Sequence, residues 1–449
     1  MAGGVGGDPS LPRTLIKDIR SCVGGLAKVQ GWVKTIRDQK KMQFLLVRDH
    51  SGVAQATVER SPAKTALNDV ISGLTRESAV TVTGTVVENP IVKTGGVEIL
   101  IHSLSVDSSA DGLIPLDPAG PVEPNPEVRQ NWRFLDLRRP ETALIFQVQT
   151  ALEHAMRDYW VREGFLEIHS PKLMGSPSEG GAEVFPFEYF GRTAYLAQSP
   201  QFYKQMAMAA GFERVFEIGP VFRADPSFTA RHATEFTGLD MEMSWIDSHE
   251  DVMAFEERWL AHSLEQVRQQ FGEAVHEVFG AEIRVPPVPF PRIRMQDALE
   301  IVARKGHSLA AGRGDLDPTG ERLIGEHAME RFGHEFAFVT DYPIDLRPFY
   351  HMRYAETPKI TKSFDLMWKG VEVTTGAQRE HRYDVLVAQA REKGLSLEPV
   401  QFYLDFFKYG CPPHGGFGAG LARMLMVLLN QPNIREVTFL FRGPTRLHP

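Results

Sequence analysis

Residues 223–242 read Arg-Ala-Asp-Pro-Ser-Phe-Thr-Ala-Arg-His-Ala-Thr-Glu-Phe-Thr-Gly-Leu-Asp-Met-Glu. Three basic side chains, Arg223, Arg231 and His232, surround a short polar loop, and an aromatic residue and three acids follow. Cations suit phosphate, an aromatic ring suits the face of a nucleobase, and carboxylates suit an amine. This one segment could therefore hold a nucleotide and an amino compound side by side.

The bulk composition is that of an ordinary soluble protein. The 449 residues, 43% of them hydrophobic and 24% charged, are enough for two or three domains with a sizeable core. The net charge of −8 gives no general attraction to nucleic acid, so such a partner would need a local basic face. The only cysteines, Cys22 and Cys411, exclude a four-cysteine zinc site and predict a reducing, cytoplasmic location. No apolar run is long enough to span a bilayer.

The first part of the chain predicts a β-barrel. Residues 1–13 read as a flexible tail, and residues 14–108 contain runs rich in β-branched residues, interrupted by a helix-like stretch at 61–74. Five runs are strand-like: Val29–Ile36, Gln43–Arg48, Val53–Val58, Ala79–Val87 and Val97–Ile101. Five strands with one helical interruption predict an OB-fold, a common oligonucleotide binder, with a plain structural barrel as the alternative.

The remaining chain predicts a second, α+β domain. Residues 109–140 are rich in proline and read as a linker or hinge before a domain at 141–449. One amphipathic helix is expected to begin near Glu141 and another to cover about His249 to Phe271, with Ser248 as its N-cap. Helices and strands then mix without the regular alternation of a dinucleotide-binding fold.

Neither usual glycine cradle for phosphates is present. The chain has no Gly-x-x-x-x-Gly-Lys-Ser/Thr sequence, and the run from Gly415 to Gly420 misses the dinucleotide spacing because Leu421 follows. Arginines and a metal would then have to hold the phosphates. Arg423 is expected in the first turn of the next helix, where the glycines would let the backbone approach a ligand. A buried helix with a surface arginine is the alternative.

A second cluster supplies candidate metal ligands. Asp365, Glu372 and Thr375 can come together if Lys369-Gly370 forms a turn between two strands. Two carboxylates and a hydroxyl suit Mg²⁺, which takes few protein ligands and keeps phosphate oxygens. A hairpin with two solvated acids is the alternative. Gln201 and Lys204 would share one face of a helix, although for such an isolated pair an ordinary solvent-exposed polar face is the favoured explanation.

The order of these motifs resembles the class II aminoacyl-tRNA synthetases, and within them the compact aspartate subgroup of archaeal and eukaryotic type. The resemblance covers residues 14–449, and the large insertion of the bacterial-type enzymes is absent. Gly164–Lys172 is similar to the first family motif, with Pro171 at the expected dimer interface; Arg223–Glu242 and Gly416–Arg423 are similar to the second and third.

The resemblance implies ATP-dependent ligation of L-aspartate to tRNA through an aspartyl-adenylate, by a cytoplasmic homodimer that uses Mg²⁺. The barrel would read the anticodon, and an antiparallel sheet flanked by helices would be catalytic. Arg223 would contact the α-phosphate and the substrate carboxylate, and Phe236 would stack on adenine. The outer phosphates would be held by Arg231, His232 and Arg423. Other ATP contacts would come from Asp225, Ala233, Glu372, Gly420, Leu421 and Ala422, and Glu372, Thr375 and Asp365 would bind the metal.

The same resemblance implies the amino acid and anticodon contacts. Lys204 and Arg379 would grip the side-chain carboxylate, which favours aspartate because a neutral amide would leave charge unpaired. Asp240 would receive the α-amino group, and the rest of the pocket would be Glu179 on a mobile loop, Gln201, Arg223 and Thr375. Phe44, Gln55 and Glu98 would read the central anticodon base by stacking and edge hydrogen bonds.

Some positions depart from the family pattern. Asp225 stands where a glutamate is usual, Ala422 stands where an acid is usual, and the end at 441–449 is altered. These departures keep a non-catalytic paralogue as an alternative, beside an asparagine–tRNA ligase. Lys34 stands where strict relatives carry an aromatic residue, and with Pro90 and Lys93 in the loop from Asn89 to Gly96 it favours charging of both tRNA(Asp) and tRNA(Asn). A strictly discriminating aspartate enzyme is the alternative.

Overall fold

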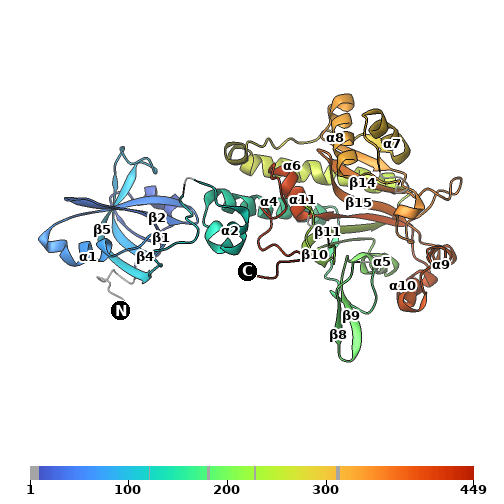
Figure 1. Ribbon diagram of the computed structural model, residues 1–449, viewed down its shortest axis with the longest axis horizontal. Helices are drawn as coiled ribbons and strands as arrows, with labels where there is room; N and C mark the ends of the chain where they lie inside the picture. The colour runs from blue at the N-terminus through green and yellow to red at the C-terminus, as the bar shows by residue number, and fades with distance from the viewer. Residues whose placement is uncertain (1–9, 121, 179–182, 227–228, 310–313) are drawn as a thin grey trace. The chain divides into compact units, whose positions relative to one another are not determined.

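The computed structural model describes residues 10–120, 122–178, 183–226, 229–309 and 314–449. The chain divides into two compact units, Met1–Arg139 and Pro140–Pro449, and each has its own hydrophobic core (Figure 1). Within the described ranges, none of the helices is both long and apolar enough to cross a membrane.

The first unit contains a closed barrel with the strand order β1-β2-β3-β5-β4. Its strands, all described, are β1 (Leu26–Asp38), β2 (Met42–Asp49), β3 (Gly52–Glu59), β4 (Ala79–Glu88) and β5 (Val97–Ser108). Alternate side chains such as Val29, Val33 and Val82 are fully buried inside it, as the β-branched pattern requires. The prediction of a five-stranded OB-fold is confirmed.

Short helices complete this unit: α1 (Thr65–Ser72) interrupts the strands at the predicted place, with η1 (Ile16–Cys22) before the barrel and η2 (Pro62–Lys64) before α1. Residues 109–140, expected as a linker, contain α2 (Pro126–Asn131) and α3 (Arg133–Asp136). Buried Asp136 pairs with Arg129 at 2.8 Å and Arg133 at 2.5 Å, which orders this proline-rich stretch.

The second unit is built on a sheet that, in its described residues, has eight strands in the order β12-β13-β14-β15-β16-β11-β10-β6. They are β6 (Leu166–Glu167), β10 (Arg214–Phe222), β11 (Glu235–Ser244), β12 (Arg292–Arg294), β13 (Phe336–Thr340), β14 (Ser363–Trp368), β15 (Val371–Arg379) and β16 (His414–Gly420). Its central pairs are antiparallel as expected, but the outermost pairs, β12 with β13 and β6 with β10, are parallel. A smaller sheet has β7 (Leu173–Met174), β8 (Pro186–Tyr189) and β9 (Arg192–Leu196).

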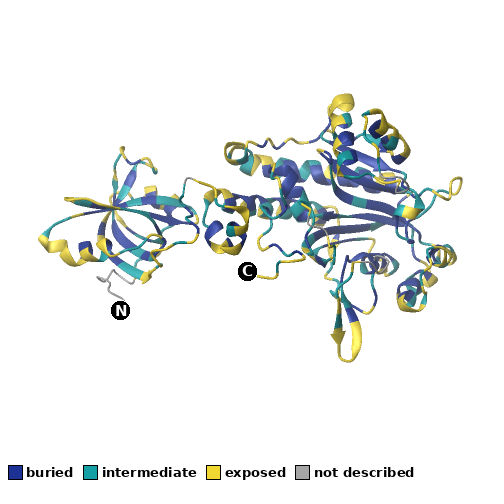
Figure 2. Cartoon of the chain, viewed as in Figure 1, coloured by how far each residue is buried: buried dark blue, intermediate teal, exposed yellow. Residues whose placement is uncertain are grey.

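Helices flank the large sheet, whose strands are mostly buried while the β8–β9 hairpin is exposed (Figure 2). They are α4 (Pro140–Arg162), α5 (Gln201–Ala209), α6 (His249–Phe279), α7 (Met295–Arg304), α8 (Pro318–Phe332), α9 (Tyr383–Glu392), α10 (Gln401–Asp405) and α11 (Leu421–Leu428). Single-turn elements are η3 (Ile344–Leu346), η4 (Glu398–Val400) and η5 (Phe406–Tyr409). Ser248 caps α6 as predicted, in a capping box with Asp251, but the helix continues past Phe271 to Phe279.

Two glycines of β16 are required by the close packing of the sheet. A Cβ on Gly416 would lie 2.1 Å from the Met241 carbonyl oxygen and 2.5 Å from Glu242 Oε2, and one on Gly418 would lie 2.9 Å from Asp240 Oδ1. These two glycines let β16 pair closely with β11 and leave room for two acids beneath the strand. Gly418 and Gly420 also line a cavity on this face of the sheet, so a close approach of their backbone to a ligand stays a prediction.

We predict that Gly416→Ala destabilises the second unit by about 3 kcal/mol, because the added methyl group overlaps the neighbouring backbone and forces β11 and β16 apart. Thermal and urea unfolding measure the change. The matched control is Gly175→Ala, where no described atom lies within 4 Å of the added Cβ. Equal melting temperatures for the two variants would contradict the role given to Gly416.

Candidate active site

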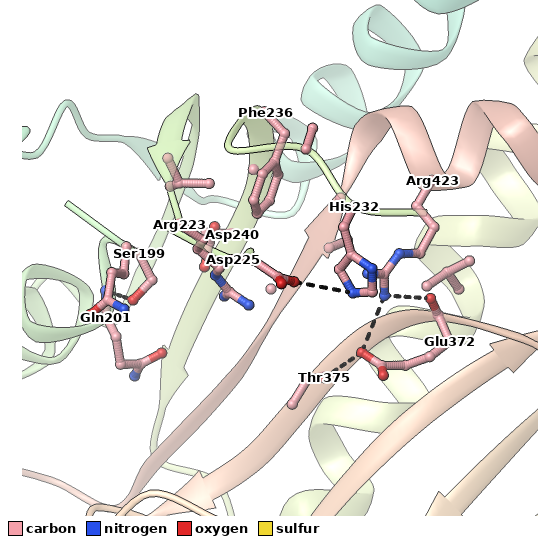
Figure 3. A pocket seen from close by; sticks show the side chains of 18 of the residues that line it. Ser199, Gln201, Arg223, Asp225, His232, Phe236, Asp240, Glu372, Thr375 and Arg423 are labelled. Carbon is pink, nitrogen blue, oxygen red and sulfur yellow. Dashed lines mark hydrogen bonds and ion pairs between the residues drawn. The ribbon is translucent and has the colours of Figure 1, made fainter. Parts of the chain in front are cut away.

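One cavity of about 370 Å³ lies on the face of the large sheet, between β10, β11, β15, β16 and the start of α11. In Figure 3, Ser199 and Gln201 lie at one end, His232, Arg423 and Glu372 lie at the other, and Phe236 lies between them along the upper wall. Most of the side chains predicted for ATP and the amino acid line this cavity, namely Gln201, Arg223, Asp225, Arg231, His232, Ala233, Phe236, Asp240, Glu372, Thr375, Arg379, Gly420, Ala422 and Arg423.

The basic end of the cavity carries cations that are already oriented. Arg231 donates to Glu321 on α8 at 2.5 Å, and Arg423, at the third position of α11, donates to the Glu372 carbonyl oxygen at 2.9 Å. His232 lies 3.8 Å from Asp225. Burial and the charge of Arg423 lower the pKa of His232, so this histidine is neutral in a site of concentrated positive charge. The arrangement suits a polyphosphate.

Glu372 and Thr375 lie together at the floor of this end. The Lys369-Gly370 turn forms as predicted, with φ angles of 50° and 76°, and joins β14 to β15. Thr375 Oγ1 donates to Glu372 Oε1 at 3.1 Å, and the Glu372 side chain is 34% exposed. A reachable carboxylate beside a hydroxyl fits Mg²⁺ bound with phosphate oxygens. Among the described residues, no group of three or more His, Cys, Asp or Glu side chains is arranged so that it could hold a metal ion.

Asp365 lies behind these two residues rather than in the cavity. It pairs with Thr375 across the hairpin, and its Oδ2 accepts from buried Arg347 at 2.7 Å. It faces a smaller cavity of about 130 Å³ that Glu372 and Thr375 also line. The alternative of a hairpin with two solvated acids is wrong for Asp365, which is buried.

The wall for a planar base is made by Phe236, with the Arg223 guanidinium 5.7 Å from its ring centroid. Ala233, Gly420 and Ala422, which have a small side chain or none, also line the cavity. Leu421, also predicted as an ATP contact, is buried in the hydrophobic core and does not line the cavity.

The other end of the cavity is dominated by Arg379 at the end of β15. It donates to Glu242 Oε1 at 3.0 Å, His351 Nε2 at 2.9 Å, Gln201 Oε1 at 3.2 Å and the Gly416 carbonyl at 3.0 Å. Burial alone would raise the pKa of Glu242, but Arg379 and Lys204 outweigh it and lower the pKa. Arg379 is therefore held in one orientation by an ionised, fully buried carboxylate.

Lys204 shares a helix with Gln201, as predicted, but does not line the cavity. Its ammonium is fully buried and contacts Asp240 Oδ1 at 2.9 Å and the carbonyls of Met241 and Phe417 at 3.3 Å. Asp240 thus lies between Lys204 and the cavity. Glu179 lies outside the described residues.

Sequence reasoning missed several residues of the amino acid end. Gln198, Ser199, Pro348, Tyr350 and His351 line the cavity. Ser199 lies two residues before Gln201, the first residue of the predicted helical pair, so its position could have been predicted from that pattern. Residues 348–351 belong to an irregular segment beside none of the motifs, and only tertiary contacts bring them to the end of β15, among them the bridge between His351 and Arg379 and a hydrogen bond from the Glu380 amide to the Tyr350 carbonyl at 2.9 Å.

The barrel brings the predicted anticodon residues to half-buried positions on neighbouring strands. Gln55 pairs with Glu98 across β3 and β5 and donates to it at 3.0 Å, and Asn89 donates to the same carboxylate at 2.9 Å. Phe44 lies on β2 with the Arg37 guanidinium 5.7 Å from its ring. An aromatic ring, a cation and edge hydrogen-bonding groups suit a splayed base.

Of the three residues predicted to govern tRNA choice, Lys34 lies at a bulge of β1, where the pairing with β2 shifts between Val33 and Thr35. Pro90 and Lys93 are exposed in the loop between β4 and β5.

Fold and site together define a class II aminoacyl-tRNA synthetase, and the chain belongs to this family. Residues 125–442 match the tRNA synthetases class II (D, K and N), and residues 27–107 match the OB-fold nucleic acid binding domain. Its homologues are aspartate–tRNA ligases. The aspartate–tRNA(Asp) ligase of Thermococcus kodakarensis is 43% identical over 95% of this chain and 97% of that protein. The aspartate–tRNA(Asp/Asn) ligase of Aeropyrum pernix is 44% identical over 97% and 98%.

A solved asparaginyl-tRNA synthetase from Pyrococcus horikoshii, complexed with asparaginyl-adenylate, is also similar, with a TM-score of 0.86 and 31% identity over 96% of this chain and 97% of that one. Since enzymes for both amino acids share this fold, the choice between them must be argued from the side chains of the site.

We predict that His414 destabilises the fold in acid. It is fully buried, its Nε2 accepts from Gln205, and burial lowers its pKa to about 4. Between pH 6.5 and 4, His414 is protonated in the unfolded chain but stays largely neutral in the folded chain. Its contribution therefore lowers the free energy of unfolding by about 3 kcal/mol over this range.

Urea unfolding at both pH values measures this loss. His414→Gln keeps an acceptor for Gln205 but has no group that titrates in this range. Between the two pH values, the free energy of unfolding of this variant should fall by about 3 kcal/mol less than that of the unmodified protein. Identical pH dependence in the two proteins would contradict the assignment.

Proposed function

We propose that this protein ligates L-aspartate to tRNA in two steps, with ATP consumed to form an aspartyl-adenylate. The observation that carries the proposal is the buried group at the amino acid end, where Arg379 faces the cavity and Lys204 lies behind Asp240. Two fixed cations favour an acidic side chain, because a neutral amide would leave charge unpaired in a dry site.

The first step needs no side-chain nucleophile or base. The aspartate α-carboxylate attacks the α-phosphorus in line, and pyrophosphate leaves. Arg223 holds the α-phosphate and the carboxylate together, and Arg231, His232 and Arg423 hold the departing phosphates. Glu372 and Thr375 would hold Mg²⁺, which neutralises phosphate charge when bound. Catalysis then consists of positioning and charge stabilisation.

The second step joins the amino acid to the terminal ribose hydroxyl of tRNA, which attacks the aspartyl carbonyl and releases AMP. We assign residues 14–108 to anticodon binding and residues 141–449 to catalysis, joined by residues 109–140. Phe44, Gln55 and Glu98 would read the central anticodon base. A splayed base is recognised by stacking and edge hydrogen bonds, which these side chains offer.

We also propose a homodimer with its interface at Pro171 and the β6 edge of the large sheet. Pro171 is exposed, and Leu166 on that edge strand is 52% exposed. Phe212 and Trp245, next to the ends of β10 and β11, are 51% and 69% exposed. Large apolar side chains at an unpaired sheet edge suit burial against a second copy.

We predict that the protein exchanges pyrophosphate into ATP when aspartate is present, with kcat/KM about a thousandfold lower for asparagine, because the amide leaves the buried cations unpaired. Purified protein, ATP, labelled pyrophosphate and each amino acid suffice for the measurement. No exchange with either amino acid would favour the non-catalytic alternative raised by Asp225 and Ala422. Preference for asparagine would overturn the role given to Arg379 and Lys204.

We further propose that the protein charges both tRNA(Asp) and tRNA(Asn). The support comes from three positions in the barrel: Lys34 stands at the bulge of β1 in place of an aromatic residue, and Pro90 and Lys93 lie in the loop between β4 and β5. The relatives include proteins named for tRNA(Asp) and for tRNA(Asp/Asn) at nearly equal identity, so overall similarity does not decide between them.

We predict aspartylation of tRNA(Asp) and tRNA(Asn) transcripts at comparable rates, measured in parallel. Lys34→Phe should lower charging of tRNA(Asn) about tenfold more than charging of tRNA(Asp), because a rigid ring restricts the base that fits beside the bulge. Lys28→Phe, on the same strand away from the bulge, is the control. Charging of tRNA(Asp) alone by the unmodified protein would reverse the proposal.

A further inference from the structure

His351 lies at the amino acid end of the cavity with 2% of its surface exposed, in a segment whose backbone is fixed. It forms an isolated β-bridge with Arg379, and the buried Gln389 amide donates to the His351 carbonyl at 3.2 Å and to the Phe349 carbonyl at 2.6 Å. The ring is thus held against the arginine that faces the substrate.

The contact between the two side chains fixes the protonation of the imidazole. Arg379 NH1 lies 2.9 Å from His351 Nε2, and a guanidinium can only donate. Nε2 must therefore carry no proton, and the single proton of the neutral ring is on Nδ1. Burial and the charges of Arg379, Arg347 and Lys393 hold the pKa of His351 well below its usual range, in agreement with this geometry.

This arrangement leaves a polar atom without compensation. His351 Nδ1 is buried and has no hydrogen-bond partner among the described residues. A buried donor without a partner is destabilising. If His351 only filled space, a leucine at this position would therefore give a more stable protein. We therefore attribute the presence of the imidazole to the hydrogen bond that its Nε2 accepts from Arg379.

The charge balance of the buried group explains why the acceptor is neutral. Lys204 and Arg379 are balanced by Asp240 and Glu242 in the structure. When Asp240 receives the substrate ammonium, Lys204, Arg379 and Glu242 retain one net positive charge, which balances the negative charge of one side-chain carboxylate. An acidic residue at position 351 would orient Arg379 equally well but would cancel that charge.

We propose that His351 is a positioning residue that determines amino acid specificity: as a neutral acceptor it fixes the Arg379 guanidinium without neutralising it, which leaves the cation for the carboxylate of aspartate. The inference rests on the proposed function. His351 acts through Arg379 rather than on the reacting atoms.

Three substitutions separate orientation, charge and packing. His351→Gln supplies a neutral acceptor at the position of Nε2, His351→Leu fills the space without an acceptor, and His351→Glu supplies a charged acceptor. The readouts are kcat and KM for aspartate, for asparagine and for ATP in pyrophosphate exchange, with melting temperatures for each variant.

We expect His351→Gln to stay within about threefold of the unmodified protein, and His351→Leu to raise the KM for aspartate about ten- to a hundredfold with little change in the KM for ATP. His351→Glu should lower the ratio of kcat/KM for aspartate to that for asparagine about a hundredfold. The control is His334→Gln: His334 is also buried, but it contacts backbone carbonyls outside the cavity, so its loss should affect stability alone.

An unchanged aspartate KM in His351→Leu, or an unchanged aspartate-to-asparagine ratio in His351→Glu, would overturn the inference. Should His351→Leu fail to fold, the comparison of His351→Gln with His351→Glu still decides, since both supply an acceptor and differ in charge. Absence of aspartate-dependent exchange in the unmodified protein would instead overturn the proposed function, and the inference with it.

Discussion

Glu242 is fully buried in the second unit, with Arg379 Nε 3.0 Å from one carboxylate oxygen and Lys204 Nζ 3.5 Å from the other. Burial of the Lys204 and Arg379 charges away from water would be strongly unfavourable without the Glu242 carboxylate. The constraint explains several other features. Gly416 has no side chain because a Cβ there would overlap Glu242. Gln201 and the Gly416 carbonyl complete the shell that orients Arg379.

This buried group also connects the sheet to the chemistry of the site. β11 supplies Asp240 and Glu242, β15 supplies Arg379, and β16 passes between them with glycines that permit the close pairing. A cation held by strands of one sheet moves little, so the site is organised before the substrate arrives. Such preorganisation is the main means by which an enzyme without a nucleophile can accelerate adenylate formation.

The two ends of the cavity use charge differently. At the phosphate end, Arg423 is paired with the partly exposed Glu372, which can exchange this contact for phosphate and metal, while Arg231 is paired with the buried Glu321. At the amino acid end the ions are buried and fixed. The first arrangement tolerates a leaving group that moves, whereas the second discriminates between side chains of nearly equal shape, because buried charges respond strongly to a mismatch.

The barrel, the start of α6 at Ser248, the β14–β15 turn and most of the cavity lining could be predicted from the sequence, because they depend on local patterns and on ordered motifs. Three contacts could not be predicted: Asp365 pairs with Arg347, Lys204 lies behind Asp240, and Leu421 packs in the core. The tertiary structure also brought His351 to Arg379. The physical reason is that burial and ion pairing arise between segments far apart in the chain, and neither periodicity nor spacing encodes which partner a charged side chain meets.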